Sequence, residues 1–394
     1  MDDSKTKQSL WVLYIAQFLS AFADNAIFFV ILGILARKGN EDPEGGMLLV
    51  QAGFLLAYVV LAPFVGAFAD KHKKSSVLLI GNLVKGIGAA LLFTGFSPAA
   101  AYTLVGIGAV VYSPAKYGVL VEICKEDTEL LMKSNGQLES STIAAILLGT
   151  LGGGFLASFS PNVGIWICLL LYGASLALAP WIRCEPGNTA LTYGASAKQF
   201  LVDVKLLFTL PKTRFTLVGT SAFWMTSSVL RIAFLMWLAK YLHVTESFEQ
   251  SAIVGITGVG IVIGALLAPY VLPVRTFYRS YLYGAVMMLI ILVAVIPVNV
   301  YVTAVLLLAI GICGAVFIIP LNTVLQDEGK DRVGSGRTIA IQNFSENLLM
   351  MIGVGVFQYL LDHGFEVKVA IIGMGVVLGG FVLYLRMMIP KVRG

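Results

Sequence analysis

Long apolar stretches recur along the chain from one end to the other, and short polar segments separate them. A run of about 20 apolar residues lets a helix cross the ~30 Å hydrocarbon core of a bilayer. The pattern predicts twelve membrane-spanning helices, at residues 10–36, 47–69, 76–95, 100–122, 134–158, 164–182, 214–241, 250–271, 280–297, 301–325, 335–361 and 367–389.

The segments outside these spans are short. The first span is too long for a secretory signal peptide and lacks a small-residue cleavage site, so we expect it to be retained. The longest connection joins the sixth span to the seventh. It divides the chain into a first half (1–182), a linker predicted to be cytoplasmic (183–213) and a second half (214–394), with no soluble domain expected.

Composition and charge support a membrane protein and give its orientation. Of the 394 residues, 58% are hydrophobic and 12% are charged, against roughly 25% charged in soluble domains. With the N-terminus in the cytoplasm, 20 of the 27 lysines and arginines lie in cytoplasmic segments or at the cytoplasmic ends of spans, and only four lie on the external side. Both termini are therefore predicted to be cytoplasmic. This asymmetry accounts for the net charge of +5, and no nucleic-acid partner is predicted.

Two short motifs recur in the second half of the chain. GAVVYSPAK at 108–116 matches GAVFIIPLN at 314–322, and GQLES at 136–140 matches NFSEN at 343–347 through Glu139 and Glu346. Six predicted spans separate the members of each pair, so the two halves cross the membrane in the same direction. An all-α polytopic protein of twelve helices in two parallel six-helix halves has the architecture of major facilitator transporters.

The loop after the second span carries a further signature. GAFADKHKK, residues 66–74, resembles the major facilitator motif between helices two and three, a glycine and an aspartate followed by basic residues. We expect Gly66 to allow close helix contact and Asp70 to accept hydrogen bonds from a neighbouring helix end in one gating state. The alternative is an ordinary basic cytoplasmic loop. The equivalent loop of the second half, 273–280, lacks the acid.

Ionisable residues are costly inside a bilayer and usually face a cavity, and the clear cases here are Asp24, Lys85, Lys116, Glu139, Arg231 and Glu346. Gln17, Ser20 and Asp24 lie on one helical face. The repeat aligns Arg231 with Asp24 or Asn25, so we expect an acid in one half to face a base in the other. This pair either contacts substrate or is a structural ion pair that holds the halves together.

The other charged residues within the spans have two possible roles or none. Lys116, beside Tyr112, is predicted either to bind an anionic head group or to neutralise Asp24. Lys85 lies close enough to the membrane surface to extend its amine to water, and no role is assigned to it. Four polar residues near the cytoplasmic ends of spans five and eleven indicate a gate or a place where head groups enter, or else helix capping and interhelical hydrogen bonds: Glu139, Gln342, Asn343 and Glu346.

The sequence offers no sign of catalysis, metal binding or nucleotide binding. The four cysteines have no metal-like spacing, and neither dinucleotide nor phosphate-loop motifs occur. Lipid acyltransferases commonly place an aspartate five residues after a histidine, but the residues in those places here are Val77, Phe248 and Lys368. We therefore predict a protein that is not an enzyme and has no cofactor.

Six blocks closely resemble the bacterial lysophospholipid transporter family: AQFLSAFADNA (16–26), YSPAKYG (112–118), SSTIAAILLG (140–149), TRFTLVGTSAFW (213–224), IPLNTVLQDEGK (319–330) and VGSGRTIAIQNFSEN (333–347). The resemblance implies a major facilitator fold in the inner membrane of a Gram-negative bacterium. It implies movement of lysophospholipids, chiefly lysophosphatidylethanolamine, from the outer to the inner leaflet. It also implies a separate acyltransferase–acyl-carrier-protein synthetase that restores the missing acyl chain.

This resemblance suggests roles for the buried residues. Arg231 and Lys116 are candidate partners of the lipid phosphate, because an arginine fork can donate two hydrogen bonds to it. Asp24, with Glu139 or Glu346 as alternatives, would meet the ammonium. Trp224, Tyr112, Phe28 and Phe29 would line the acyl chain. The rival interpretation is a major facilitator transporter of a drug or small polar solute, with these carboxylates carrying a coupling proton or sodium ion.

Overall fold

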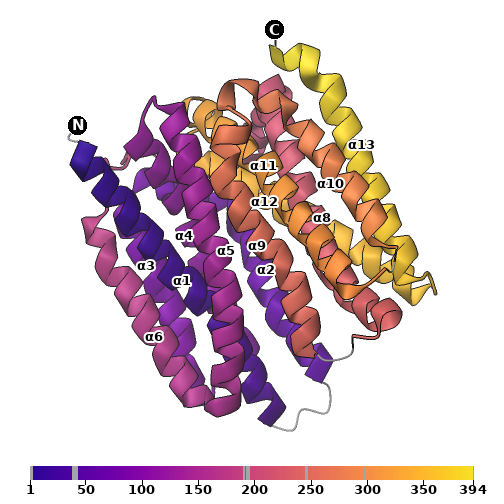
Figure 1. The fold of residues 1–394 in the computed structure, drawn as a ribbon. Helices are drawn as coiled ribbons and strands as arrows, with labels where there is room; N and C mark the ends of the chain where they lie inside the picture. Colours follow the sequence, from indigo (N-terminus) through magenta and orange to yellow (C-terminus); the bar gives the residue numbers. More distant parts are fainter. Residues whose placement is uncertain are drawn as a thin grey trace. The chain divides into compact units, whose positions relative to one another are not determined.

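The computed structural model describes residues 3–37, 43–189, 191, 196–244, 247–296 and 298–393, and all regular structure in them is helical (Figure 1). The α-helices are α1 (Asp3–Arg37), α2 (Pro43–Lys71), α3 (Lys74–Leu91), α4 (Pro98–Cys124), α5 (Thr128–Phe159), α6 (Pro161–Leu178), α7 (Ser196–Thr209), α8 (Pro211–Leu242), α9 (Ser247–Val271), α10 (Ser280–Ala294), α11 (Val300–Arg332), α12 (Ser335–Asp362) and α13 (Val367–Arg393). Three 3₁₀ segments, η1 (Leu92–Thr94), η2 (Ala179–Trp181) and η3 (Val274–Arg279), connect them.

Each of the twelve predicted spans coincides with one of these helices. Within the described residues, eleven helices are long and apolar enough to cross a membrane. The predicted span 47–69 falls on α2, which is 29 residues long. Many large apolar side chains on the spans are exposed, which is expected where lipid rather than water surrounds a helix bundle. Examples are Trp166, Leu170, Tyr270, Leu289, Val305 and Leu383.

The linker contains a helix, α7, that the span pattern does not predict. Phe200, Asp203 and Leu207 are buried on one face of α7, at positions i, i+3 and i+7. Leu201 and Val202 are exposed on the other side. With 14 residues, α7 is shorter than a membrane span and is therefore absent from a hydropathy-based count.

The chain forms two compact units, and each combines parts of both sequence halves. Unit one comprises Met1–Glu126, Ala144–Val204 and Gly329–Phe344, and unit two comprises Asp127–Ile143, Lys205–Glu328 and Ser345–Gly394. The first turns of α5 therefore belong with the later helices, and the first turns of α12 belong with the earlier ones.

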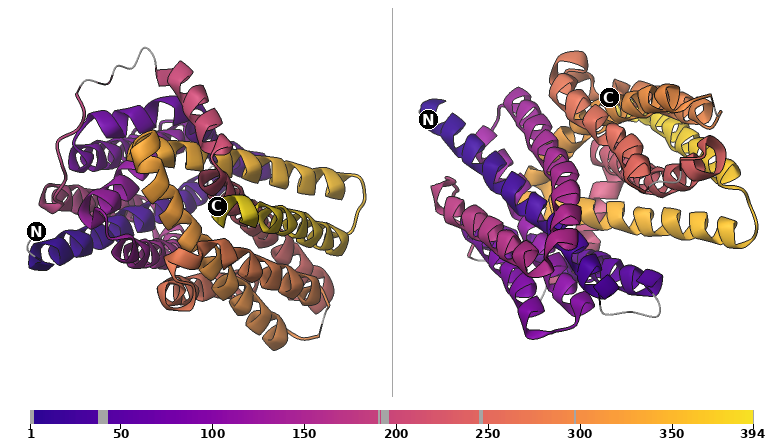
Figure 2. Two further views of the ribbon diagram at one scale, coloured as in Figure 1. Left: turned by 90° about the horizontal axis from the view of Figure 1, so that it is seen from above. Right: turned by 60° about the horizontal axis from the view of Figure 1, so that its bottom comes forward.

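In unit one, α4 packs against α2 and α3, while α6 packs against α1 and α3. Figure 2 shows these helices from two further sides. Gly81 and Gly108 lie where α3 and α4 approach most closely. A Cβ atom on Gly108 would lie 2.5 Å from the Gly81 carbonyl oxygen, and one on Gly81 would lie 2.9 Å from the Gly108 carbonyl oxygen. Only glycine fits at this crossing, and the close approach brings the polar side chains of α3 beside α4.

Unit two is built around α8, which packs against α9 and α13, and α13 in turn packs against α10. Its hydrophobic core contains fully buried aromatic residues, among them Phe215, Phe234, Trp237 and Phe317. The core residues of α8 alternate with small hydroxyl residues such as Thr216, Thr220 and Thr226, whose hydroxyls bond carbonyls of their own helix. These threonines therefore satisfy their polarity without a partner helix.

Candidate functional site

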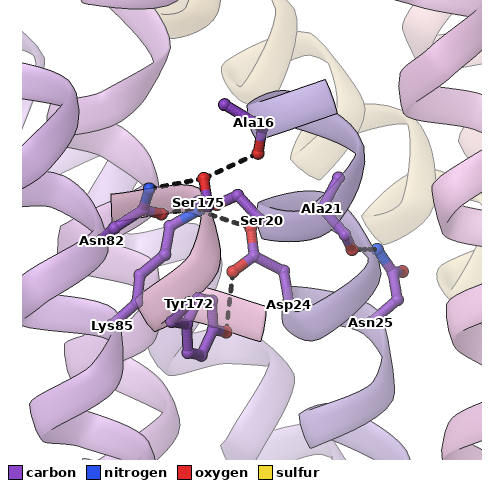
Figure 3. Close-up of polar contacts among 9 residues, drawn as sticks. All are labelled: Ala16, Ser20, Ala21, Asp24, Asn25, Asn82, Lys85, Tyr172 and Ser175. Carbon is purple, nitrogen blue, oxygen red and sulfur yellow. Dashed lines mark hydrogen bonds and ion pairs between the residues drawn. The ribbon is translucent and has the colours of Figure 1, made fainter. Parts of the chain in front are cut away.

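A buried ion pair lies in the middle of unit one, between α1, α3 and α6 (Figure 3). Lys85 Nζ lies 2.7 Å from Asp24 Oδ2, and the Tyr172 hydroxyl donates a 2.8 Å hydrogen bond to Asp24 Oδ1. Both carboxylate oxygens thus accept from side chains of the same unit. The Lys85 side chain is 2% exposed and that of Asp24 is 17% exposed.

A chain of hydrogen bonds continues from the lysine. Lys85 Nζ donates to Ser20 Oγ (2.9 Å), and Ser20 donates to Asn82 Oδ1 (2.7 Å). Asn82 Nδ2 then donates to Ser175 Oγ (2.8 Å), whose hydroxyl donates to the carbonyl oxygen of Ala16 (2.7 Å). Every polar group in the chain has a partner of the right kind, as buried polar groups require.

This arrangement corrects the expectation that Lys85 extends its amine to the membrane surface. Its position along α3 allows that, but its face of the helix points into unit one, where Asp24 offers a compensating charge. Sequence spacing contained a signal for these residues. Asn82 and Lys85, like Tyr172 and Ser175, are three residues apart and so share a helical face.

Of the other predicted residues of unit one, Tyr112 contacts this pair, whereas the contacts given for Asn25 and Lys116 are with other residues. The Tyr112 ring centroid lies 4.8 Å from Lys85 Nζ, a cation–π distance. Asn25 donates to the Ala21 carbonyl oxygen at 2.8 Å, within α1. Lys116 is buried, with its amine 4.7 Å from the Tyr117 ring centroid. The lysine paired with Asp24 is Lys85, whereas neutralising Asp24 was one of the two roles predicted for Lys116.

Arg231 belongs to unit two and differs from these buried pairs. Its side chain is exposed, and no hydrogen bond or ion pair joins it to another described residue of unit two. Trp224, two turns earlier on α8, is partly buried beside Phe223, with ring centroids 5.3 Å apart. Direct pairing of Asp24 with Arg231 stays a prediction.

Asp70, at the end of α2, caps the start of α12. Its Oδ1 accepts from the backbone N–H of Gly336 (2.7 Å) and from the Ser335 hydroxyl (3.4 Å), and its Oδ2 accepts from the N–H of Arg337 (3.1 Å). The first N–H groups of a helix have no partner within the helix, so this carboxylate satisfies two of them. The hydrogen bonds expected of Asp70 are thus present, and they join the two sequence halves within unit one.

Gly334 makes this contact possible. Its φ of +101° lies in the region that favours glycine, and a Cβ atom there would lie 2.6 Å from Asp70 Oδ2. Asp70 lies just beyond the predicted span 47–69. Burial raises the pKa of its carboxyl above the ordinary value, although the hydrogen bonds from Gly336 and Arg337 act in the opposite direction.

The linker helix also holds the start of α12. Arg337 Nη1 lies 3.1 Å from Asp203 Oδ2. Asp203 Oδ1 accepts a 2.7 Å hydrogen bond from Gln199 Nε2. The Phe200 and Phe344 rings meet edge to face, with centroids 5.5 Å apart. The first turns of α12 therefore contact both α2 and α7 within unit one.

The four residues predicted near a gate are placed in two units. Asn343 belongs to unit one, where its Nδ2 donates to Ser113 Oγ on α4 at 2.9 Å. Gln342 belongs to unit one as well, while Glu139 and Glu346 belong to unit two, and all three are buried. One turn before Glu139, Asn135 forms a reciprocal amide pair with Gln326 of α11, at 2.9 and 3.1 Å.

Comparison with known proteins gives the family. The model of the Major Facilitator Superfamily matches residues 13–354. The chain belongs to this superfamily. It is 36% identical over 368 residues to the lysophospholipid transporter LplT of Photorhabdus laumondii, with 92% of this chain and 91% of that protein covered. It is 37% identical over 379 residues to LplT of Escherichia coli O7:K1, with 94% of each covered. The chain is therefore also a member of the lysophospholipid transporter family.

Solved structures of other facilitator proteins show the same fold. The Escherichia coli fucose:proton symporter FucP superposes with a TM-score of 0.74 at 12% sequence identity, covering 96% of this chain and 98% of that one. The human organic anion transporter MFSD10 superposes with a TM-score of 0.75 at 14% identity, covering 97% and 99%. At these identities the likeness establishes the facilitator fold and nothing about substrate.

Proposed function

We propose that this protein transports lysophospholipids, chiefly lysophosphatidylethanolamine, from the outer to the inner leaflet of the inner membrane of a Gram-negative bacterium. The observation that carries the proposal is the 36–37% identity to lysophospholipid transporters over more than 90% of both chains. The substrate is amphiphilic, so the transporter needs a polar site for a phosphate and an apolar path for one acyl chain.

Arg231 is proposed to bind the phosphate. An exposed guanidinium inside a membrane span, without a partner among the described residues of unit two, is ready for an anionic ligand. Its planar fork matches two phosphate oxygens at once. Lys116 is proposed as a second candidate partner of the phosphate. Asp24 and Asn25 would supply the polar centre that the head group crosses, and Tyr112 and Trp224 would line the acyl chain.

Asp70 is proposed to belong to a gate. The contact between α2 and α12 would be intact in one state of an alternating-access cycle and broken in the other. The contact consists of hydrogen bonds from two backbone N–H groups and one hydroxyl, so breaking it would separate no ion pair. Glu139, Gln342, Asn343 and Glu346 would contribute to this gate or to the place where head groups enter.

The product would appear on the cytoplasmic side. The distribution of lysine and arginine predicts that both termini lie in the cytoplasm. A lysolipid delivered to the inner leaflet would then be available to an acyltransferase–acyl-carrier-protein synthetase that restores the second acyl chain. That enzyme would be a separate protein. The transporter itself would carry out no catalytic step and would need no cofactor.

Flipping by purified protein in liposomes tests the proposal. Lysophosphatidylethanolamine with a labelled head group is added outside, and its loss from the outer leaflet is followed by extraction with albumin. The unchanged protein should flip the lipid above protein-free vesicles, whereas Arg231→Ala should lose most of the rate and Arg231→Lys should retain part of it. Folded protein that does not flip lysolipid, but moves a small solute in response to an ion gradient, would overturn the lipid assignment.

A further inference from the structure

Lys85 and Asp24 differ in how far an incoming molecule can reach them. The aspartate retains 17% of its side-chain surface, but the lysine retains 2%. A head group that enters from the accessible side therefore meets the carboxylate first and the lysine amine not at all.

The hydrogen bonds around the pair occupy both carboxylate oxygens and fix the lysine amine. Asp24 Oδ1 accepts from Tyr172, and Oδ2 accepts from Lys85. The lysine amine is fixed in turn by Ser20 Oγ at 2.9 Å and by the face of the Tyr112 ring. The Ser20 hydroxyl donates its only proton to Asn82 Oδ1, so its oxygen can only accept a hydrogen bond from the lysine. The network thus holds an ionised carboxylate together with a charged primary amine.

A primary ammonium is also the group that an ethanolamine head group carries. For this group to take the place of Lys85, the lysine charge would be left buried and without a counter-ion, which is strongly unfavourable. The lysine is also tethered to α3, which gives it a high effective concentration beside Asp24. A substrate ammonium is therefore poorly placed to displace it.

We propose that Lys85 is a specificity-determining residue that acts as an internal substitute for the ammonium of a head group. It keeps the charge of Asp24 cancelled, so lysolipids are accepted whether or not their head group carries an amine. This proposal rests on the proposed lysophospholipid transport. It also revises the expectation that Asp24 itself meets the ammonium.

The test compares the flipping rates of lysophosphatidylethanolamine and lysophosphatidylglycerol, which carries a phosphate but no amine. Lys85→Met removes the charge and keeps the stem, and Lys85→Arg keeps a charge. Lys74→Met is the matched control, since Lys74 is equally buried in a 2.6 Å pair with Glu122, away from Asp24.

Lys85→Met should raise the ratio of ethanolamine to glycerol lipid about tenfold, because the uncovered carboxylate attracts the ammonium and repels the lipid that has only a negative charge. A tenfold change corresponds to about 1.4 kcal/mol. Lys85→Arg and Lys74→Met should leave the ratio within about twofold of the unchanged protein. A folded Lys85→Met protein that flips lipid with an unchanged ratio would overturn the proposal.

A second variant covers the case in which Lys85→Met does not fold. Asp24→Asn with Lys85→Met removes both charges, so the pair stays neutral. In this double variant the ratio of the two flipping rates should equal that of the unchanged protein, whatever the overall rate. Selective loss of the ethanolamine lipid would show that Asp24 binds the ammonium directly, and the proposal would be wrong. Failure of the unchanged protein to flip either lipid would instead refute the proposed function.

Discussion

The amide pair between α5 and α11 should be energetically coupled. Asn135 and Gln326 are both buried, exchange hydrogen bonds of 2.9 and 3.1 Å, and Asn135 reaches Thr323 Oγ1 at 3.3 Å. Asn135→Leu removes these bonds and leaves the buried Gln326 amide without its partner. A buried polar group that loses its partner costs about 1–3 kcal/mol. The single substitution should therefore lower the free energy of unfolding by about 3 kcal/mol.

Gln326→Met should cost a similar amount, for the same reason. The double variant, Asn135→Leu with Gln326→Met, replaces both amides by apolar groups of similar size and should cost about 1 kcal/mol or less. The double-mutant cycle then gives a coupling energy of about 5 kcal/mol. Measured coupling energies between contacting residues usually lie between about 0.5 and 3 kcal/mol. We therefore take a measured coupling of about 2 kcal/mol or more as support for the amide pair.

Unfolding in mixed detergent micelles, followed by circular dichroism, measures these differences. Gln358→Met is the control, because Gln358 lies on the exposed surface of α12 and bonds the exposed Asp362, so its loss should change stability by less than about 0.5 kcal/mol. If the two single substitutions simply add in the double variant, the amides do not act as a pair and the reasoning fails.

Three further outcomes are expected. Asp70→Ala should speed hydrogen exchange at the start of α12 about tenfold or more, because the N–H groups of Gly336 and Arg337 lose their acceptor. Asp70→Asn, which keeps one acceptor and avoids burying a charge, should change it less, and exposed Asp331→Asn not at all. Gly334→Ala should lower thermal stability through both its φ of +101° and its clash with Asp70, whereas Gly355→Ala, with nothing within 4 Å, should not; equal effects would contradict this reading. Asp203→Ala should speed exchange in the first turns of α12 by uncoupling Arg337, while exposed Lys198→Ala should have no effect there; unchanged exchange would remove α7 from the account.

Hydropathy predicts the helices well because length and apolarity decide whether a segment crosses a bilayer. All twelve predicted spans coincide with helices, from α1 to α13. The exception is α7, whose buried face includes the charged Asp203 and whose length is below that of a span. Its stability depends on contacts with Phe344 and Arg337, which are more than 130 residues away in the chain.

Pairing of buried charges was harder to predict. Sequence position indicates how deep Lys85 lies along α3, but not which neighbouring helix its face meets. Its partner depends on the packing of α1, α3 and α6 around Asp24, which the sequence does not specify. By contrast, the hydrogen bonds of Asp70 were predictable, because the motif at residues 66–74 resembles one in which the aspartate is expected to accept from a neighbouring helix end.

The most direct test of lysophospholipid transport compares lipids that differ only in their number of acyl chains. Labelled lysophosphatidylethanolamine and labelled phosphatidylethanolamine are incorporated in the outer leaflet of the same proteoliposomes, and each is followed to the inner leaflet. The account predicts protein-dependent movement of the one-chain lipid and none of the two-chain lipid. Equal movement of both lipids, or movement of neither above protein-free vesicles, would contradict it.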